Sequence, residues 1–297
     1  MSSTLRIAMI APPWAGLPPH RYGGIEAVCA SLVEGLVDHG HHVTLFGAGE
    51  DKTRAKFVQT YAEPQYTRLG QSLPECAHLA AVSRVLARLD VDLVHDHTCV
   101  GLLTASVRSV PTVATMHGPM TAEVRRYVGD CAAMTRGKGS LNLVAISDDQ
   151  RSRGNGLPWL GRVHNAVNVR RFPFGARKED FVLFLGRSSP EKGMDAAIDA
   201  ARHAGRHLII AAKCSEPAEH AYFEERIRPR LGPGVTWLGE VDERRKLDLL
   251  MRARCLLFPI QWDEPFGMVL IEAMSCGTPV VALSRGSVPE LIEDGVT

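Results

Sequence analysis

Two glutamates near the end of the sequence flank a turn that suits an anion. Glu264 and Glu272 are separated by seven residues, which include a proline and a glycine. The pattern predicts a buried strand over 255–259, a loop, and a helix over 268–275. Unpaired N–H groups in the first turn of such a helix carry partial positive charge and suit a phosphate. Carboxylates repel phosphate, so this pair suits hydroxyl-rich groups on either side of one, such as a sugar and a ribose.

Two cations follow an earlier strand of the same half of the chain. Residues 186–193 read Gly-Arg-Ser-Ser-Pro-Glu-Lys-Gly, directly after a predicted strand over 181–185. Arg187 offers a planar fork for a diphosphate, and Lys192 offers a compact charge beside a predicted helix start. Lys213, after the next predicted strand, could add a third contact or could equally be a surface charge.

Polar residues also end three predicted strands of the first half. The first of these strands ends in His95-Asp96-His97, and the second is followed by His117-Gly118. The carboxyl ends of parallel strands meet at one edge of a sheet, so we expect these side chains to lie together. Alternate histidines could share a metal, although two polar residues facing a cleft are the commoner case. Ser147, after the third strand, is typical of a helix cap in a capping box.

A pair of glycines follows the first predicted strand and a proline-rich loop. Gly23 and Gly24 would let a ligand approach the backbone closely at the start of a predicted helix. An ordinary pair of loop glycines is about as good an explanation.

The motif around the two glutamates has a known counterpart. Glu264, Glu272 and the following Ala-Met-Ser-Cys-Gly-Thr-Pro-Val-Val resemble the E-x7-E signature of family-4-type retaining glycosyltransferases, also described as glycosyl transferases group 1. The resemblance covers nearly the whole chain. It implies the GT-B type of fold and transfer of a hexose from a UDP-, GDP- or ADP-sugar to an acceptor hydroxyl, without a cofactor or a metal. The acceptor could be a sugar, a lipid or another small molecule.

The resemblance also implies a role for each candidate residue. Glu264 would bind hydroxyls of the transferred sugar, and Glu272 would bind the ribose. Arg187 and Lys192 would stabilise the leaving diphosphate, which would take the acceptor's proton in a front-face attack, and His117 would face the sugar. Other donor-site residues that it implies are Gly23, Gly24, Lys213, Val241, Phe266, Gly267, Met268 and Val269.

Strand and helix patterns alternate through both halves, which places the chain in the α/β class. Together with the resemblance, this predicts two facing Rossmann-like, doubly wound parallel-sheet domains. We expect an acceptor-side domain over 1–172 and a nucleotide-sugar-binding domain over 173–297, with a polar linker near 170–180. The predicted strands are 5–11, 42–46, 91–95, 111–115 and 141–146, then 181–185, 207–212, 235–238, 255–259 and 280–283; helices include 74–89, 194–204 and 222–230.

The family continues beyond the position that corresponds to Thr297, with another strand and further helices. We therefore expect the second domain to be incomplete. A missing strand would leave an open sheet edge, so we expect lower stability, lower activity and self-association.

The composition limits which partners and which cellular environment the protein is expected to have. The 297 residues carry a net charge of +1 with acids and bases interspersed, which does not point to nucleic acid. Seven scattered cysteines without a C-x-x-C pair favour reduced thiols in the cytoplasm. There is no signal-peptide pattern and no apolar run long enough to span a bilayer. The segment 121–139 carries Arg125, Arg126, Arg136 and Lys138, which could touch a membrane or an anionic acceptor, although a solvated helix face is the commoner explanation.

Two other functions stay open. A sugar-nucleotide epimerase of the same architecture would need acid and base groups around the sugar, and the E-x7-E context disfavours it. A non-catalytic remnant that binds nucleotide-sugars is the other alternative. The sequence contains neither G-x-G-x-x-G nor G-x-x-x-x-G-K-[ST], which disfavours a nicotinamide dehydrogenase or a P-loop enzyme. The donor base, the acceptor and a possible homo-oligomer are not determined by these patterns.

Overall fold

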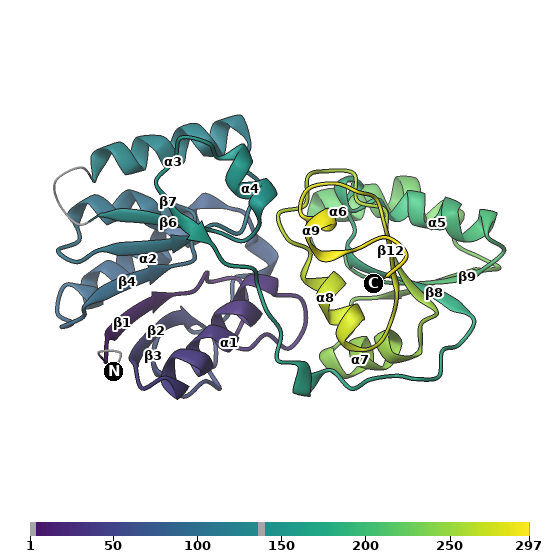
Figure 1. Cartoon of the computed structure of the whole chain (residues 1–297), viewed down its shortest axis with the longest axis horizontal. Coiled ribbons are helices and arrows are strands. Elements are labelled where there is room, and N and C mark those ends of the chain that lie inside the picture. The colour runs from purple at the N-terminus through teal and green to yellow at the C-terminus, as the bar shows by residue number, and fades with distance from the viewer. Residues whose placement is uncertain (1–3, 136–139, 297) are drawn as a thin grey trace. The chain divides into compact units, whose positions relative to one another are not determined.

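The computed structural model describes residues 4–135 and 140–296 and divides them into two compact units (Figure 1). The first unit comprises Met1–Pro19 and Gly23–Asn165, and the second comprises His20–Tyr22 and Ala166–Thr297. The change of unit near residue 165 lies a few residues before the predicted domain boundary at 172, which stays a prediction.

The first unit contains a parallel sheet in which the described strands follow the order β3-β2-β1-β4-β5-β6-β7. The chain starts in the middle of the sheet, builds outward in one direction, and then returns to build outward in the other. This is the doubly wound arrangement, with its switch point between β1 and β4. The strands are β1 (Arg6–Ile10), β2 (His42–Ala48), β3 (Lys56–Tyr61), β4 (Leu93–Asp96), β5 (Thr112–Thr115), β6 (Leu141–Ala145) and β7 (Trp159–Arg162).

Helices cover both faces of this sheet because successive strand residues point to opposite sides. Met9 and Leu45 pack with helix α1 (Gly24–Asp38), whereas Ala8, Ile10 and Phe46 pack with α2 (Ser72–Leu86). A third cluster joins β5 and β6 to α3 (Ala122–Met134) and to the 3₁₀ segment Val100–Val107. The short α4 (Asp148–Arg153) follows β6.

The second unit repeats the same winding with five described strands in the order β10-β9-β8-β11-β12. Its switch point lies between β8 and β11, which pair in parallel through Cys255–Val182 and Leu256–Leu183. The strands are β8 (Phe181–Arg187), β9 (His207–Lys213), β10 (Val235–Gly239), β11 (Cys255–Phe258) and β12 (Val280–Ala282).

Two cores sandwich this second sheet. Val182, Phe184 and Ile210 pack with α5 (Met194–His203) on one face. Leu183 and Leu185 pack on the other face with α7 (Glu243–Arg252) and α8 (Met268–Ser275). Figure 1 shows α5 and α6 (Pro217–Tyr222) on one side of the sheet and α7 and α8 on the other. The short α9 (Val288–Leu291) comes last.

The structure differs from the predicted elements mainly at edges and ends. The strands β3 and β7, which were not predicted, lie at the two edges of the first sheet, where burial is partial and hydrophobic periodicity is weak. The segment predicted as a helix over 222–230 contains only the last residue of α6, followed by the π-helical turn Phe223–Ile227 and the 3₁₀ turn Arg228–Arg230. A proline at position 229 lacks an N–H and cannot continue an α-helix, which explains the irregular ending.

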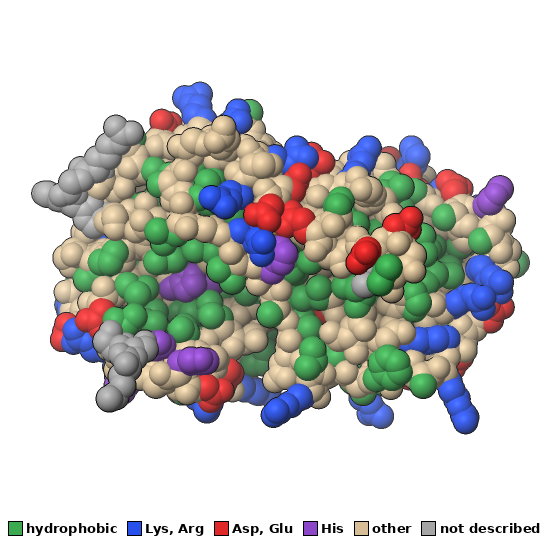
Figure 2. Space-filling view, viewed as in Figure 1, with side chains coloured by type: hydrophobic (Ala, Val, Ile, Leu, Met, Phe, Trp, Pro, Cys, Tyr) green, Lys and Arg blue, Asp and Glu red, His purple; other side chains and the backbone are tan. Residues whose placement is uncertain are grey.

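The surface carries charges of both signs without a single basic stripe on the visible face (Figure 2). The predicted basic segment is partly described: Arg125 and Arg126 are exposed on α3, whereas Arg136 and Lys138 lie outside the described residues. No helix in the described ranges is long and apolar enough to cross a membrane.

Candidate active site

The switch point of the second unit brings together two of the charged residues that the sequence singled out, Lys192 and Glu264. Glu264, in the loop after β11, is 7% exposed. Its Oε2 accepts hydrogen bonds from Lys192 Nζ at 2.6 Å and from Trp262 Nε1 at 2.8 Å. Lys192 lies 5.1 Å from the centre of the Trp262 ring, so it is held by a carboxylate and an aromatic face together. The fold therefore joins two residues that are 72 positions apart in the sequence.

A glycine brings the loops after β8 and β11 into contact. Gly193 has φ +71, and a Cβ atom on it would collide with the backbone carbonyl of Pro259. The close approach also places Gln261, whose N–H donates to the carbonyl oxygen of Glu191 at 2.8 Å. Lys192 reaches Glu264 because these two loops touch.

Helix α8 begins next to this cluster. Gly267 precedes it with φ +82, a left-handed conformation that favours glycine, and no side chain caps the helix. The helix starts at Met268 and Val269, where N–H groups carry the partial positive charge of a helix start. Phe266 is buried, and its carbonyl oxygen accepts a hydrogen bond from Ser287 Oγ at 2.9 Å, which holds the loop before the helix.

The remaining charged candidates each have a partner of opposite sign. Arg187 pairs with Glu191 at 2.9 Å, and Glu272 pairs with Lys246 Nζ at 2.8 Å on the second turn of α8. Val241, just after β10, is partly buried against the apolar core. None of these positions touches the Lys192–Glu264 pair through a hydrogen bond that the described residues show.

Lys213 is not a surface charge, so one of the two alternatives that the sequence left for this residue is wrong. Its side chain is fully buried and forms ion pairs with Glu216 at 2.7 Å and Glu219 at 2.8 Å. Two carboxylates more than neutralise one ammonium. A direct contact between Lys213 and a diphosphate stays a prediction, and these two neighbours would oppose it.

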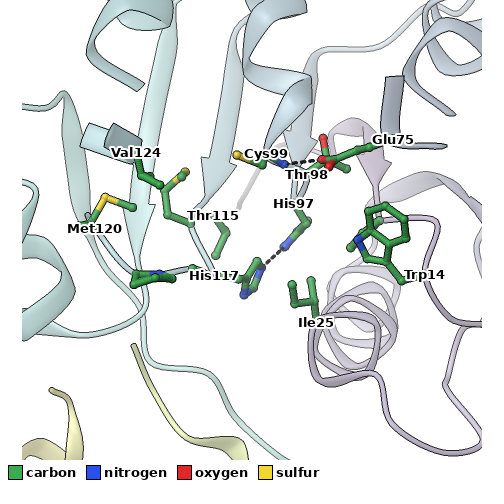
Figure 3. Close-up of a pocket in the computed structure, with 14 residues that line it drawn as sticks. Trp14, Ile25, Glu75, His97, Thr98, Cys99, Thr115, His117, Met120 and Val124 are labelled. Atoms are coloured by element: carbon green, nitrogen blue, oxygen red, sulfur yellow. Dashed lines mark hydrogen bonds between the residues drawn. The ribbon is translucent and has the colours of Figure 1, made fainter. Parts of the chain in front are cut away.

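The first unit has a pocket of about 220 Å³ at the carboxyl ends of β4 and β5 (Figure 3). His97 and His117 point toward one another there, with 2.9 Å between His97 Nδ1 and His117 Nε2. The side chain of Gln150 fixes the His117 loop, because its Nε2 donates to the carbonyl oxygens of Met116 and Gly118 at 2.8 Å each. Residues lining the pocket are Pro12, Trp14, Ile25, Glu75, His97, Thr98, Cys99, Thr115, Met116, His117, Gly118, Pro119, Met120 and Val124.

Burial keeps these imidazoles uncharged. Burial lowers the pKa of His95 to about 4 and that of His97 well below its usual value. Burial and the His95 ring together lower the pKa of His117 to about 3. His95 Nε2 is paired with the Thr115 hydroxyl at 2.8 Å. All three histidines are therefore neutral near pH 7.

Gly23 and Gly24 begin α1, as expected. A Cβ atom on Gly23 would press against Pro19 and Ala15, so the glycine allows the proline-rich loop to fold onto the helix start. Glu26 secures the same loop by accepting a hydrogen bond from the Ala15 N–H at 3.1 Å, and burial raises its pKa to about 7.

Sequence reasoning missed Trp262, Lys246 and Gln150. Trp262 stands two residues before Glu264, and an indole beside an acidic loop was an available signal. Ser147 caps α4 as predicted, since its Oγ accepts from the Gln150 N–H at 3.0 Å. The Gln150 side chain turns instead to the Ile146 N–H and to the His117 loop, so the capping box is only half formed.

The described residues contain no group of three or more His, Cys, Asp or Glu that could hold a metal, and the seven cysteines are all free.

Comparison with known families resolves what kind of protein this is. The description "Glycosyltransferase Family 4" matches residues 22–170, half of the chain, and "Glycosyl transferases group 1" matches residues 168–297. The chain belongs to glycosyltransferase family 4. This family 4 protein is a glycosyltransferase, as the sequence resemblance implied, and both of its units contribute to the match.

Individual relatives of this glycosyltransferase agree with that assignment. It is 26% identical to phosphatidyl-myo-inositol mannosyltransferase of Mycobacterium tuberculosis, over 98% of this chain and 81% of the relative. It is 27% identical to a glycogen synthase of the same species, over 69% of this chain and 55% of the relative.

Solved structures confirm the GT-B fold. AviGT4, a glycosyltransferase involved in avilamycin A biosynthesis, aligns with a TM-score of 0.71 and 28% identity over 97% of this chain and 81% of AviGT4. Anabaena Alr3699/HepE, whose structure holds UDP and glucose, aligns with a TM-score of 0.74 and 21% identity over 98% of this chain and 84% of HepE. The predicted α/β class with two doubly wound parallel sheets is confirmed.

Proposed function

We propose that this glycosyltransferase moves a hexose from a nucleotide diphosphate-sugar to an acceptor hydroxyl with retention of the anomeric configuration. The observation that carries the proposal is the cluster of Lys192, Glu264 and Trp262 at the switch point of the second unit. Open parallel sheets bind ligands at this place. The cluster offers a cation for phosphate and a carboxylate for hydroxyls, side by side.

The diphosphate would lie against the start of α8. The N–H groups of Met268 and Val269, together with Lys192 and Arg187, would stabilise the charge that develops as the nucleotide diphosphate leaves. Lys192 and Glu264 neutralise one another in the structure. A diphosphate would compete for Lys192, which would leave Glu264 free to accept hydrogen bonds from sugar hydroxyls.

Glu272 would bind the ribose. It lies two helical turns into α8, and its partner Lys246 would hold it in place. The proposed front-face attack needs no protein base, because a phosphate oxygen of the leaving group takes the acceptor's proton. The role of His117 toward the sugar stays a prediction from the family resemblance.

Relatives support a hexose as the transferred group. The curated relatives at 26–27% identity are named for mannosyl transfer and for glycogen synthesis. They do not agree on one donor or one acceptor. The base and the sugar are therefore best found by a panel of UDP-, GDP- and ADP-hexoses.

The first test is donor binding by thermal shift, followed by product analysis with the labelled donor that binds. Glu264→Gln should abolish transfer, including slow transfer to water, while binding of the nucleotide diphosphate stays nearly intact. Glu272→Ala should weaken nucleotide binding by about 1–3 kcal/mol, the scale for a hydrogen bond to a charged group. Glu225→Gln, an exposed glutamate outside the cluster, is the matched control.

Each product would point to a different function. A transferred hexose supports the proposal, an epimerised nucleotide-sugar would support an epimerase, and binding without turnover would support a non-catalytic binding protein. A chelator should leave turnover unchanged. Strict dependence on a divalent metal, or normal turnover by Glu264→Gln, would contradict the assigned roles.

A further inference from the structure

The first unit contains a row of three imidazoles, two of which, His97 and His117, line the pocket. The ring centres of His95 and His97 are 4.3 Å apart, and those of His97 and His117 are 5.2 Å apart. His97 is the middle ring and only 4% exposed. The only hydrogen bond that the described residues show for this ring joins His97 Nδ1 to Nε2 of His117 at 2.9 Å.

Two neutral imidazoles that share one hydrogen bond have linked tautomers. Each neutral ring carries one N–H, and only one hydrogen fits between Nδ1 of His97 and Nε2 of His117. If that hydrogen belongs to His97, then His117 must carry its own hydrogen on Nδ1. If it belongs to His117, then His97 must carry its hydrogen on Nε2. The two outer nitrogens are therefore always in opposite states.

The surroundings of His97 favour one of these two states. His97 Nε2 is buried and has no hydrogen-bond partner within the described residues. A buried N–H without an acceptor is a rare and unfavourable arrangement, whereas an unpaired lone pair is tolerated somewhat more often. The hydrogen of His97 therefore belongs on Nδ1, where it has the His117 nitrogen as its acceptor.

We propose that His97 is a positioning residue that holds His117 in its Nδ1–H tautomer, so that His117 acts in the pocket as a hydrogen-bond donor. The low pKa values of both rings agree with this, because each remains neutral over the working range. The clamp from Gln150 to the backbone on both sides of His117 fixes the loop that carries the ring. His95 Nε2 is paired with the Thr115 hydroxyl, so this nitrogen does not compete for the hydrogen that lies between His97 and His117.

The consequence for catalysis rests on the proposed function. Nδ1 of His117 already carries a hydrogen, so it cannot take the proton of the acceptor hydroxyl there. It can donate to a lone pair on an oxygen of the ligand. In the proposed reaction, the acceptor oxygen bonds to the anomeric carbon as the bond from that carbon to the diphosphate oxygen breaks, and the hydroxyl proton passes to the leaving phosphate. The tautomer that His97 enforces is the one compatible with this route.

The direct test is NMR of protein with ¹⁵N-labelled histidine at pH 7.5, because the two ring nitrogens of a neutral imidazole report which one carries the hydrogen. His117 is assigned from the signal missing in His117→Asn. We expect the Nδ1–H form in the wild type. In His97→Phe, which keeps a ring and removes both nitrogens, His117 should change to the Nε2–H form that free neutral histidines prefer. In His97→Asn, whose amide N–H can replace the Nδ1–H group, the Nδ1–H form should return.

His78 provides the matched control. It is also a fully buried histidine of the first unit with an unpartnered Nε2, but its Nδ1 bonds the Thr60 hydroxyl and not His117. His78→Phe should leave the His117 tautomer unchanged. An Nε2–H form of His117 in the wild type, or a tautomer that does not respond to His97→Phe, would overturn the proposal.

Turnover gives a second, separate readout. His97→Phe should lower kcat roughly ten- to a hundredfold with little change in the donor's KM, as expected for one lost hydrogen bond to developing charge. His97→Asn should recover most of that loss. A His117 tautomer that changes as expected while no hexose is transferred even by the wild type would refute the proposed function and leave the tautomer assignment confirmed.

Discussion

The Lys192–Glu264 pair depends on a third residue that holds both partners. The Trp262 indole N–H donates to the same carboxylate oxygen that Lys192 contacts, and its ring lies beneath the ammonium. In the proposed reaction, a donor that draws Lys192 toward its phosphate would leave Trp262 to orient Glu264. Preorganised groups of this kind stabilise charge without having to reorganise during the reaction.

Replacing Trp262 separates these two contributions. Trp262→Phe keeps an aromatic face for Lys192 and removes the N–H, so kcat should fall about tenfold while nucleotide diphosphate affinity changes little. Trp262→Ala removes the ring as well and should weaken binding too. Steady-state kinetics and calorimetric titration of the nucleotide measure the two effects. Unchanged kcat in Trp262→Phe would show that Lys192 alone positions the carboxylate.

The loops after β8 and β11 approach most closely at Gly193, and this contact supports the cluster between them. Gly193→Ala would strain a left-handed residue and push a methyl group into the carbonyl of Pro259. We expect about 2–4 kcal/mol of lost stability and a larger loss of turnover, because both loops carry site residues.

Gly205→Ala is the control for backbone strain alone. Gly205 has φ +62, and a Cβ atom there would meet nothing within 4 Å. The Gly205→Ala variant should lose only about 1–2 kcal/mol of unfolding free energy, measured by urea unfolding, and its turnover should be normal. Equal losses in the two variants would mean that the Pro259 contact can relax.

The central strands and their polar ends could be predicted from sequence, because buried strands form short apolar runs and their ends carry glycine and charge. The prediction for α8 over 268–275 matched the structure, and Glu264 and Lys192 were both selected. The pairing between them was not predicted, since it depends on how loops 72 residues apart pack. The burial of Lys213 was also not predicted, although its partners Glu216 and Glu219 lie only three and six residues later in the chain, at the start of α6.

Across the whole molecule, buried histidines tie stability to pH. Burial lowers the pKa of His78 and His95 to about 4, that of His117 to about 3 and that of His97 well below its usual value. The unfolded chain binds these protons near pH 6.5, before the folded protein does. Stability should therefore fall as the pH drops from about 6.5 to 4, by up to ~1.4 kcal/mol per pH unit for each histidine.

Glu26 has the opposite effect on stability over an overlapping pH range. Its pKa of about 7 lies above its unfolded value, so its contribution falls as the pH rises from about 4.5 to 7. Four histidines outweigh this one group. Urea unfolding at several pH values should show the net loss in acid, and His78→Leu should reduce the slope below pH 6 by roughly one proton. All five groups lie in the first unit, so a second unit that unfolds first in acid would contradict this account.

The winding order of the two sheets also determines when each can form during synthesis. Strand β1 is central, and Ile10 must wait for Asp96 of β4, about 85 residues later in the chain. At a translation rate of about 5–20 residues per second, this takes roughly 4–17 s. During that interval, one edge of an almost fully apolar strand has no partner on the nascent chain. The second unit repeats the delay, because β8 waits for β11. In each sheet, an apolar strand is therefore exposed to chaperones near the ribosome exit before the strand that pairs with its free edge has been made.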